Sequence, residues 1–275
     1  MSERPILVAT DLTVRSDRAL DRGVQLASQM GAPLVVAHAV EHETPAAQAL
    51  VGRARESLDR EVRELGFAAG GMLLTGSPPE QVADAAERIK ARLIVMGAPR
   101  YNELRDRLTG TALDALLRRV NVPVLVVKRR ARAPYRRLVA ATDFSEASRA
   151  ALFVAAELFA DAEITLLHTY SRPVPVRLKA DEMTAYGRER AREGMDEFLA
   201  GLGGRELSLN VRIEEGPTAP TVETVAEQLD ADLIVLGAHG ASGYVHATIG
   251  SQASEIINWS NRDLLVVRRR AEGPR

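Results

Sequence analysis

The chain of 275 residues is long enough for about two domains at roughly 150 residues each. Hydrophobic residues make up 46% of it and charged residues 27%, which excludes a wholly disordered chain. The net charge of −1 gives no basic excess for nucleic acid, and the absence of cysteine excludes disulfides and thiolate metal sites. No apolar run approaches the roughly 18–20 residues of a membrane span, and the N-terminus does not resemble a signal peptide. We therefore expect a cytoplasmic protein without a nucleic-acid or membrane partner.

Four short apolar segments occur twice in the chain, in the same order. The first copies begin at Ile6, Val35, Leu93 and Val124, and the second copies begin at Leu138, Thr165, Leu233 and Leu264. The offset is 132 and 130 residues for the first two segments and 140 for the last two, so the second half carries an insertion, placed around Ser171–Ala180. The repeat predicts two homologous domains, residues 1–130 and 135–275, joined by a short basic linker that ends at Pro134.

The second half alternates apolar runs with amphipathic stretches. The runs predict strands at Arg137–Thr142, Ile164–His168, Leu209–Ile213, Leu233–Leu236 and Leu264–Val267. The amphipathic stretches predict helices that start at Ser145 as N-cap and that cover Leu178–Leu202, Pro220–Leu229 and Ser251–Trp259. Continuous Val/Ile/Leu strands between helices are typical of a parallel sheet covered on both faces. The expected fold class is therefore α/β, with two repeated open five-stranded parallel sheets layered with helices.

Ligands of open parallel sheets bind beyond the carboxyl ends of the strands. After the fourth strand of the second half, Gly237 is expected to let the chain turn, and Gly240 to allow a positive φ or close approach of a ligand. Gly250 and Ser251 then open a helix, whose N-terminal N–H groups favour a phosphate. Asp143, at the end of the first strand, suits ribose hydroxyls. In the simpler alternative, the glycines only form turns and Asp143 only caps a helix.

The spacing of these residues resembles the nucleotide motif of the universal stress protein family, which is Gly, two residues, Gly, nine residues, Gly, then Ser or Thr. The resemblance covers both halves and implies tandem domains of the adenine nucleotide alpha hydrolase-like type. It further implies a regulatory role in the stress response and ATP or a related adenine nucleotide as ligand, with or without Mg²⁺. By the same resemblance, Thr142 and Asp143 would face ribose and adenine, Gly237, His239 and Gly240 would line the start of the loop, and Gly250, Ser251 and Gln252 would hold phosphates.

The first half departs from this motif at one position. Gly97, Gly110 and Thr111 are present, but Arg100 stands where the second glycine belongs. A side chain there occupies phosphate space and strains a positive φ, which predicts a weakened or lost first site. Arginine also pairs with phosphate, so a rescued site stays open as an alternative.

Two other functional classes compete with a nucleotide-binding regulator. A slow ATP hydrolase or phosphotransferase would need a general base and a cation at the phosphates, and the second-half loop offers only Asp143 and no Lys or Arg. The expectation is therefore no enzyme, or at most a weak ATPase. An interaction module that needs no nucleotide fits the first half better than the second.

Three remaining features are interpreted without the motif. His38 and His168 end matching strands and are taken as structural, with a ligand-facing role as the alternative, and Trp259 is expected to pack. The fifth strands, Val122–Lys128 and Asp263–Arg268, are expected at sheet edges, where unpaired strands invite pairing. We therefore expect the halves to form an internal pseudo-dimer, with a homodimer of chains as a further possibility.

Overall fold

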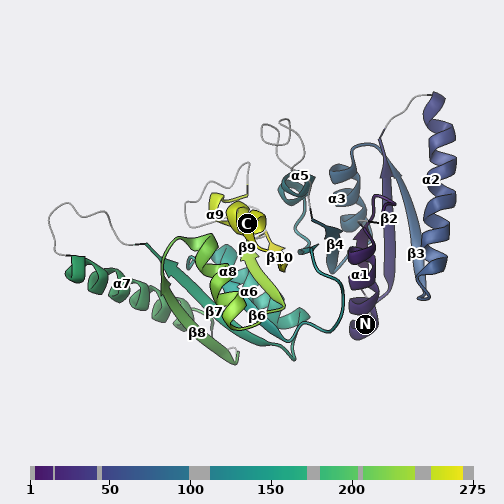
Figure 1. Cartoon of the computed structure of the whole chain (residues 1–275). Helices are drawn as coiled ribbons and strands as arrows, with labels where there is room; N and C mark the ends of the chain where they lie inside the picture. The colour runs from purple at the N-terminus through teal and green to yellow at the C-terminus, as the bar shows by residue number, and fades with distance from the viewer. Residues whose placement is uncertain are drawn as a thin grey trace. The chain divides into compact units, whose positions relative to one another are not determined.

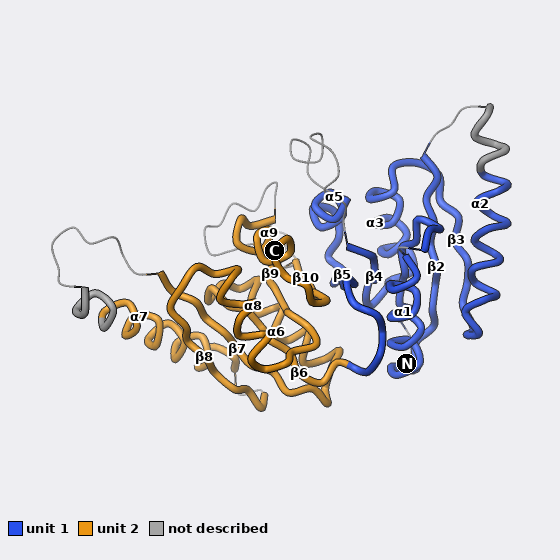
Figure 2. Tube along the Cα trace, viewed as in Figure 1, with its two compact units in different colours: residues 1–134 blue, residues 135–275 orange. Residues whose placement is uncertain are grey.

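The computed structural model describes residues 4–14, 16–41, 45–98, 112–171, 180–203, 207–238 and 249–268. The chain divides into two compact units, Met1–Pro134 and Tyr135–Arg275, which Figure 2 shows in blue and orange. The boundary follows Pro134, the last residue of the expected linker.

The first unit is an α/β layer with a parallel sheet (Figure 1). Its elements in chain order are β1 (Ile6–Ala9), α1 (Asp17–Met30), β2 (Leu34–Val40), α2 (Pro45–Glu64), β3 (Ala69–Thr75), α3 (Pro78–Arg88), β4 (Leu93–Gly97), α5 (Ala112–Arg119) and β5 (Val124–Val127). The strand order is β3-β2-β1-β4-β5, and every pair is parallel.

The second unit repeats this arrangement. Its elements are β6 (Arg137–Ala141), α6 (Glu146–Leu158), β7 (Glu163–Tyr170), α7 (Ala180–Ala200), β8 (Leu209–Glu215), α8 (Thr218–Gln228), β9 (Leu233–Gly237), α9 (Ser251–Trp259) and β10 (Asp263–Val267). The order is β8-β7-β6-β9-β10, again with parallel pairs. The expected α/β class, the alternation of elements and the parallel sheets are confirmed.

Helices cover both faces of each sheet because the order in which the chain adds strands reverses partway through the unit. The chain moves outward from β6 to β8 and then returns to β9 and β10. Right-handed crossovers therefore place α6 and α7 on one face and α8 and α9 on the other, and α8 packs against α9. Covered on both faces, the central strands are apolar along their length: Leu233, Ile234 and Val235 in β9 are completely buried.

The reversal places the ends of β6 and β9 beside each other. Leu138 pairs with Leu233 and Ala140 with Val235, so the residues after β6 emerge next to Gly237. This is the topological switch point, where the loops after two neighbouring strands separate and leave a crevice. The residues expected to bind a ligand on both strands thus meet at one place.

Local signals start the helices that border this crevice. Ser145 is the N-cap of α6, as expected, and its Oγ accepts a hydrogen bond from the backbone N of Ser148 at 3.2 Å. Helix α8 begins at Thr218, two residues before the expected start, because Pro217 stands at its N-cap position with an extended backbone. Helix α9 covers Ser251–Trp259, as expected.

Gly237 is required for packing and not, as expected from the sequence, for a sharp turn. It is the last residue of β9 and does not have a positive φ. A Cβ at this position would lie 2.7 Å from the backbone carbonyl carbon of Ala147 and from the backbone N of Ser148. Glycine therefore lets the first turn of α6 lie directly against the end of β9.

Trp259 also differs from the expectation that it packs. It is the last residue of α9 and its side chain is 60% exposed. The buried side chains of this helix are Ala253, Ile256 and Ile257, which take the face toward the sheet and leave Trp259 outside that stripe.

The fifth strands occupy the end of the strand order in each unit, β5 beside β4 and β10 beside β9. The internal pseudo-dimer and the homodimer stay predictions.

Replacement of Gly237 by alanine is expected to lower the free energy of unfolding by about 1–3 kcal/mol, the usual cost of overpacking. The atoms it would meet belong to backbone and cannot move aside by a rotamer change. Gly70→Ala, in β3, is the control because its Cβ would meet nothing within 4 Å. Denaturant unfolding followed by circular dichroism measures both, and equal small effects would contradict the packing role.

Candidate functional site

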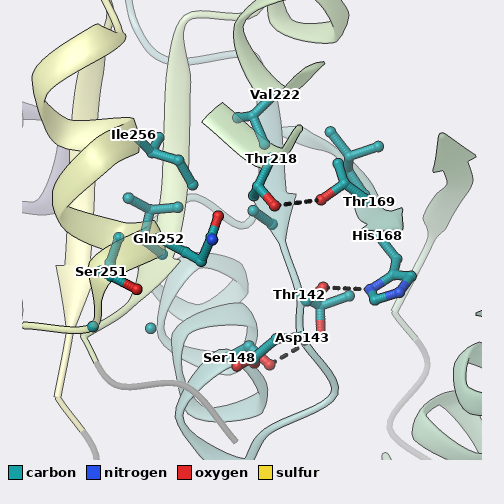
Figure 3. Close-up of a pocket in the computed structure, with 16 residues that line it drawn as sticks. Thr142, Asp143, Ser148, His168, Thr169, Thr218, Val222, Ser251, Gln252 and Ile256 are labelled. Carbon is teal, nitrogen blue, oxygen red and sulfur yellow. Dashed lines mark hydrogen bonds between the residues drawn. The ribbon is translucent and has the colours of Figure 1, made fainter. Parts of the chain in front are cut away.

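A cavity of about 270 Å³ lies at the carboxyl edge of the second unit's sheet (Figure 3). Its walls come from the ends of β6, β7 and β9 and from the first turns of α6, α8 and α9. Four of its apolar lining residues are Leu167, Val222, Leu236 and Ile256. The polar side chains that line it are Thr142, Asp143, Ser148, His168, Thr169, Thr218, Ser251 and Gln252.

The structure brings most of the sequence-predicted site residues to this cavity. The lining includes Thr142, Asp143, Gly237, Gly250, Ser251 and Gln252. His239 and Gly240 lie outside the described residues, as do Arg100, Gly110 and Thr111 of the first half.

The turn after β6 is built around the hydroxyl of Thr142. This buried Oγ1 accepts a hydrogen bond from the backbone N of Phe144 at 3.0 Å and lies 2.9 Å from Ser148 Oγ. Asp143 is exposed to the cavity, and its Oδ1 accepts from the backbone N of Ser145 at 3.1 Å. Asp143 therefore stabilises the turn before the cap residue, Ser145, and also lines the cavity.

Phe144 holds this turn in a strained backbone conformation. Its φ of +65° is the left-handed region, which costs an L-residue roughly 1–2 kcal/mol. The ring stacks on His168, with 4.1 Å between centroids and 25° between planes, and it also contacts Phe198 of α7. Gly194 makes room for the ring, since a Cβ there would lie 2.7 Å from Cε2 of Phe144. This aromatic packing offsets the strain and keeps Asp143 at the cavity mouth.

His168 holds the turn after β6 and also lines the cavity. Its Nδ1 donates a hydrogen bond to the backbone O of Thr142 at 2.8 Å, which ties β7 to the turn after β6. The same side chain lines the cavity. Burial lowers the pKa of His168 below its ordinary value of 6.5, although the hydrogen bond to Thr142 and the charge of Asp143 act in the opposite direction. The ring is therefore neutral at pH 7, with Nδ1 protonated and Nε2 available as an acceptor.

The first turn of α9 faces the cavity opposite these groups. Its N-cap, Gly250, has no side chain to cap the helix, and the first turn contains no acidic residue. The backbone N of Gly250 donates to the O of Ala238 at 2.9 Å, which fixes where the helix starts. The uncapped N–H groups and the positive end of the helix dipole give this wall an affinity for anions.

Sequence reasoning did not find Ser148, Thr169 and Thr218, which also line the cavity. A signal for two of them existed. In a parallel α/β sheet the first turn of each helix lies near the carboxyl edge of the strands, so the polar residues at the starts of α6 and α8 were candidates. Thr169 follows His168 in β7 and had no comparable signal.

The first unit repeats part of this geometry. His38 Nδ1 donates to the backbone O of Thr10 at 2.9 Å, and Leu12 has a φ of +55° where the second unit has Phe144. Here Thr10 Oγ1 instead donates to Glu61 Oε1 at 3.1 Å, and burial raises the pKa of the Glu61 carboxyl above its ordinary value of 4.5.

Two classes of feature are absent from the described part of the chain. No group of three or more His, Cys, Asp or Glu side chains there is placed to hold a metal ion. None of the helices described is both long and apolar enough to cross a membrane.

Comparison with known proteins identifies the family. The model of the universal stress protein family matches residues 3–128 and again residues 134–268. The chain belongs to the universal stress protein family. Its two units are thus two tandem domains of this family, and the resemblance inferred from the glycine spacing is confirmed.

Individual members of the universal stress protein family match along most or part of the chain. A universal stress protein of Mycobacterium tuberculosis is 21% identical over 297 residues, which cover 96% of each chain. One from Methanocaldococcus jannaschii is 31% identical over 75 residues, 27% of this chain and 46% of that protein. The crystal structure of a universal stress protein from Archaeoglobus fulgidus superposes with a TM-score of 0.68 at 20% identity, over 96% of both chains.

The pKa of His168 predicts a pH dependence of stability. In the unfolded chain His168 takes up a proton near pH 6.5, whereas in the folded second unit it stays neutral to a lower pH. The free energy of unfolding therefore falls as the pH drops below 6.5, by at most about 1.4 kcal/mol per pH unit. His168→Asn keeps a donor for Thr142 but cannot titrate. Unfolding at pH 7.5 and 5.5 should show a smaller loss for the variant than for wild type, and identical losses would contradict the assignment.

Proposed function

We propose that this universal stress protein is a nucleotide-binding regulator that holds ATP, or a related adenine nucleotide, in its second unit. The observation that carries the proposal is the convergence of Asp143 and the uncapped N-terminus of α9 on one cavity. The first suits ribose hydroxyls and the second suits phosphates. The spacing of Gly237, Gly250 and Ser251 agrees with the family's nucleotide motif.

The cavity has a lining suited to such a ligand and a volume just below that of typical small-molecule pockets. Its volume of about 270 Å³ is close to the lower end of small-molecule pockets, which start at roughly 300 Å³. Apolar side chains such as Val222 and Ile256 offer surfaces for a flat base, and Asp143 is the one carboxylate among the lining residues that the structure describes. Mg²⁺ would then enter with the phosphates, which are its usual ligands.

The lining favours binding over chemistry. No Lys or Arg is among the described residues around the cavity, so no cation there would neutralise a phosphoryl group in transfer. His168, the one histidine in this lining, uses Nδ1 to hold Thr142. The competing function, a slow ATPase, is tested by measuring phosphate release with and without Mg²⁺. Turnover abolished by Asp143→Ala would favour that alternative.

The first unit differs at several of the matching positions. Thr169 and Thr218 correspond to Ala39 and Pro78, and Gln252 corresponds to Ala112. Ala253 corresponds to Leu113, which is almost fully buried. The first unit therefore loses polar groups and gains a larger side chain where the second unit has its cavity.

In the first unit, two hydroxyls of the same turn bond to Asp11, the counterpart of Asp143. The Oδ1 of Asp11 accepts from Thr13 Oγ1 at 2.6 Å and from Ser16 Oγ at 2.7 Å. In the second unit the matching hydroxyls of Ser145 and Ser148 bond to the backbone of α6 and to Thr142. The residues Ala39, Pro78 and Leu113 of the first unit support a preference for the second unit on grounds separate from Arg100.

Two substitutions should separate the ribose contact from the phosphate contact. Asp143→Ala is expected to weaken ATP and adenosine alike, by about 1–3 kcal/mol, since both ligands carry the ribose. Gly250→Val is expected to weaken ATP by at least tenfold and to leave adenosine unchanged, because the start of α9 meets only phosphates. Calorimetric titration of both ligands measures this. Loss of thermal stability in Asp143→Ala with both affinities intact would reduce Asp143 to a turn residue.

Copying the first unit's leucine into the second unit should close the site. In wild type we expect one nucleotide per chain, and Ala253→Leu should lower the affinity at least tenfold, because the new side chain enters the cavity. Ser254→Leu is the matched control: it adds the same side chain one position further on α9, outside the cavity lining. Two nucleotides per wild-type chain, or full binding by Ala253→Leu, would contradict the assignment to the second unit.

A further inference from the structure

A pair of threonine hydroxyls lines the cavity away from the start of α9. Thr169, near the end of β7, donates a hydrogen bond from Oγ1 to Oγ1 of Thr218, the first residue of α8, over 3.0 Å. Both side chains are half-buried and both line the cavity. In Figure 3 the pair lies on one side of the cavity and Ser251 on the other, with Gln252 between them.

The position of the pair assigns it to the base end of the proposed nucleotide. With phosphates at the start of α9 and the ribose at Asp143, as proposed above, the side of the cavity at β7 and α8 is left for the base. The apolar side chain of Val222, one turn into α8, lines the same side and provides a surface for a ring. A base at this end meets the apolar surface of Val222 and the two threonine hydroxyls, which are placed to form hydrogen bonds with its edge.

The two hydroxyls leave a defined set of donors and acceptors for a ligand. Two hydroxyls hold two hydrogens, and the bond between them uses one. One hydroxyl hydrogen and at least one lone pair are left for a ligand, at two oxygens 3.0 Å apart. Adenine presents the complement on one edge, with an amino group that donates and a neighbouring ring nitrogen that accepts.

We propose that the Thr169–Thr218 pair recognises the amino-bearing edge of adenine and is a specificity determinant of the second unit. One hydroxyl oxygen accepts from the 6-amino group, and the remaining hydroxyl hydrogen goes to the adjacent ring nitrogen. The inference rests on the proposed nucleotide function and adds to it which residues read the base.

The first unit shows that the pair is not needed for the fold. The matching residues there are Ala39 in β2 and Pro78 at the first position of α3, neither of which has a hydroxyl. Helix α3 nonetheless begins at Pro78 in the same way as α8 begins at Thr218. The hydroxyls are therefore not required to form these elements, which agrees with a role in binding a ligand.

The test compares ATP with purine riboside 5′-triphosphate, which lacks only the 6-amino group. Wild type should prefer ATP. Thr218→Val removes the hydroxyl at constant shape and should weaken ATP about tenfold and the analogue less, so that the preference shrinks at least threefold, which is about 0.65 kcal/mol of coupling. Thr169→Val should act in the same direction. Thr221→Val, on α8 outside the cavity lining, is the control and should change neither affinity.

A second variant distinguishes a loss of base preference from a loss of folding. Thr218→Pro copies Pro78, and the φ of −65° and ψ of 135° at Pro217 are compatible with a following proline. It should keep the melting temperature within a few degrees and reproduce the loss of preference. Equal weakening of ATP and analogue by Thr218→Val, or no change in either, would overturn the base-reading role while leaving nucleotide binding intact. Failure of wild type to bind either ligand would overturn the proposed function and this inference with it.

Discussion

The pairing of β6 with β9 is the constraint on which the rest of the second unit depends. Because these parallel strands are neighbours at the point where the chain reverses its path, their carboxyl ends open into one crevice. Gly237 then lets the start of α6 approach β9 to a distance that no side chain would permit. Asp143, the start of α9 and the cavity between them owe their positions to this one junction.

Around that junction the protein stabilises a conformation that the backbone alone disfavours. The left-handed Phe144 is held by its stack on His168 and by the space that Gly194 leaves on α7. His168 in turn bonds to the backbone of Thr142, so the turn is fixed from two strands and one helix. A ligand that contacts Asp143 meets a carboxylate that is already in place, which lowers the ordering cost of binding.

Much of this was accessible from the sequence, because the repeat and the apolar runs are strong signals. The parallel sheets, the N-cap at Ser145 and the extent of α9 follow from patterns within a few residues. The reason for Gly237 did not, since it depends on a helix almost 90 residues earlier in the chain. Trp259 was misjudged because hydrophobicity alone does not tell on which side of a helix a terminal residue falls. Thr169 and Thr218 meet only in three dimensions, and no spacing rule joins them.

The two units share one architecture but differ in the residues at the carboxyl edge of their sheets. Both units have a hydrogen bond from a histidine to the backbone O of the threonine after the first strand, His38 to Thr10 at 2.9 Å and His168 to Thr142 at 2.8 Å. The polar side chains of Thr169, Thr218 and Gln252 at the crevice of the second unit are replaced by Ala39, Pro78 and Ala112 in the first. A crystal structure of the chain grown with ATP tests this asymmetry most directly. The account predicts nucleotide density in the second unit, with phosphates at Gly250 and Ser251 and the base beside Thr169 and Thr218. Density in the first unit alone, or phosphates at the threonine pair, would contradict it.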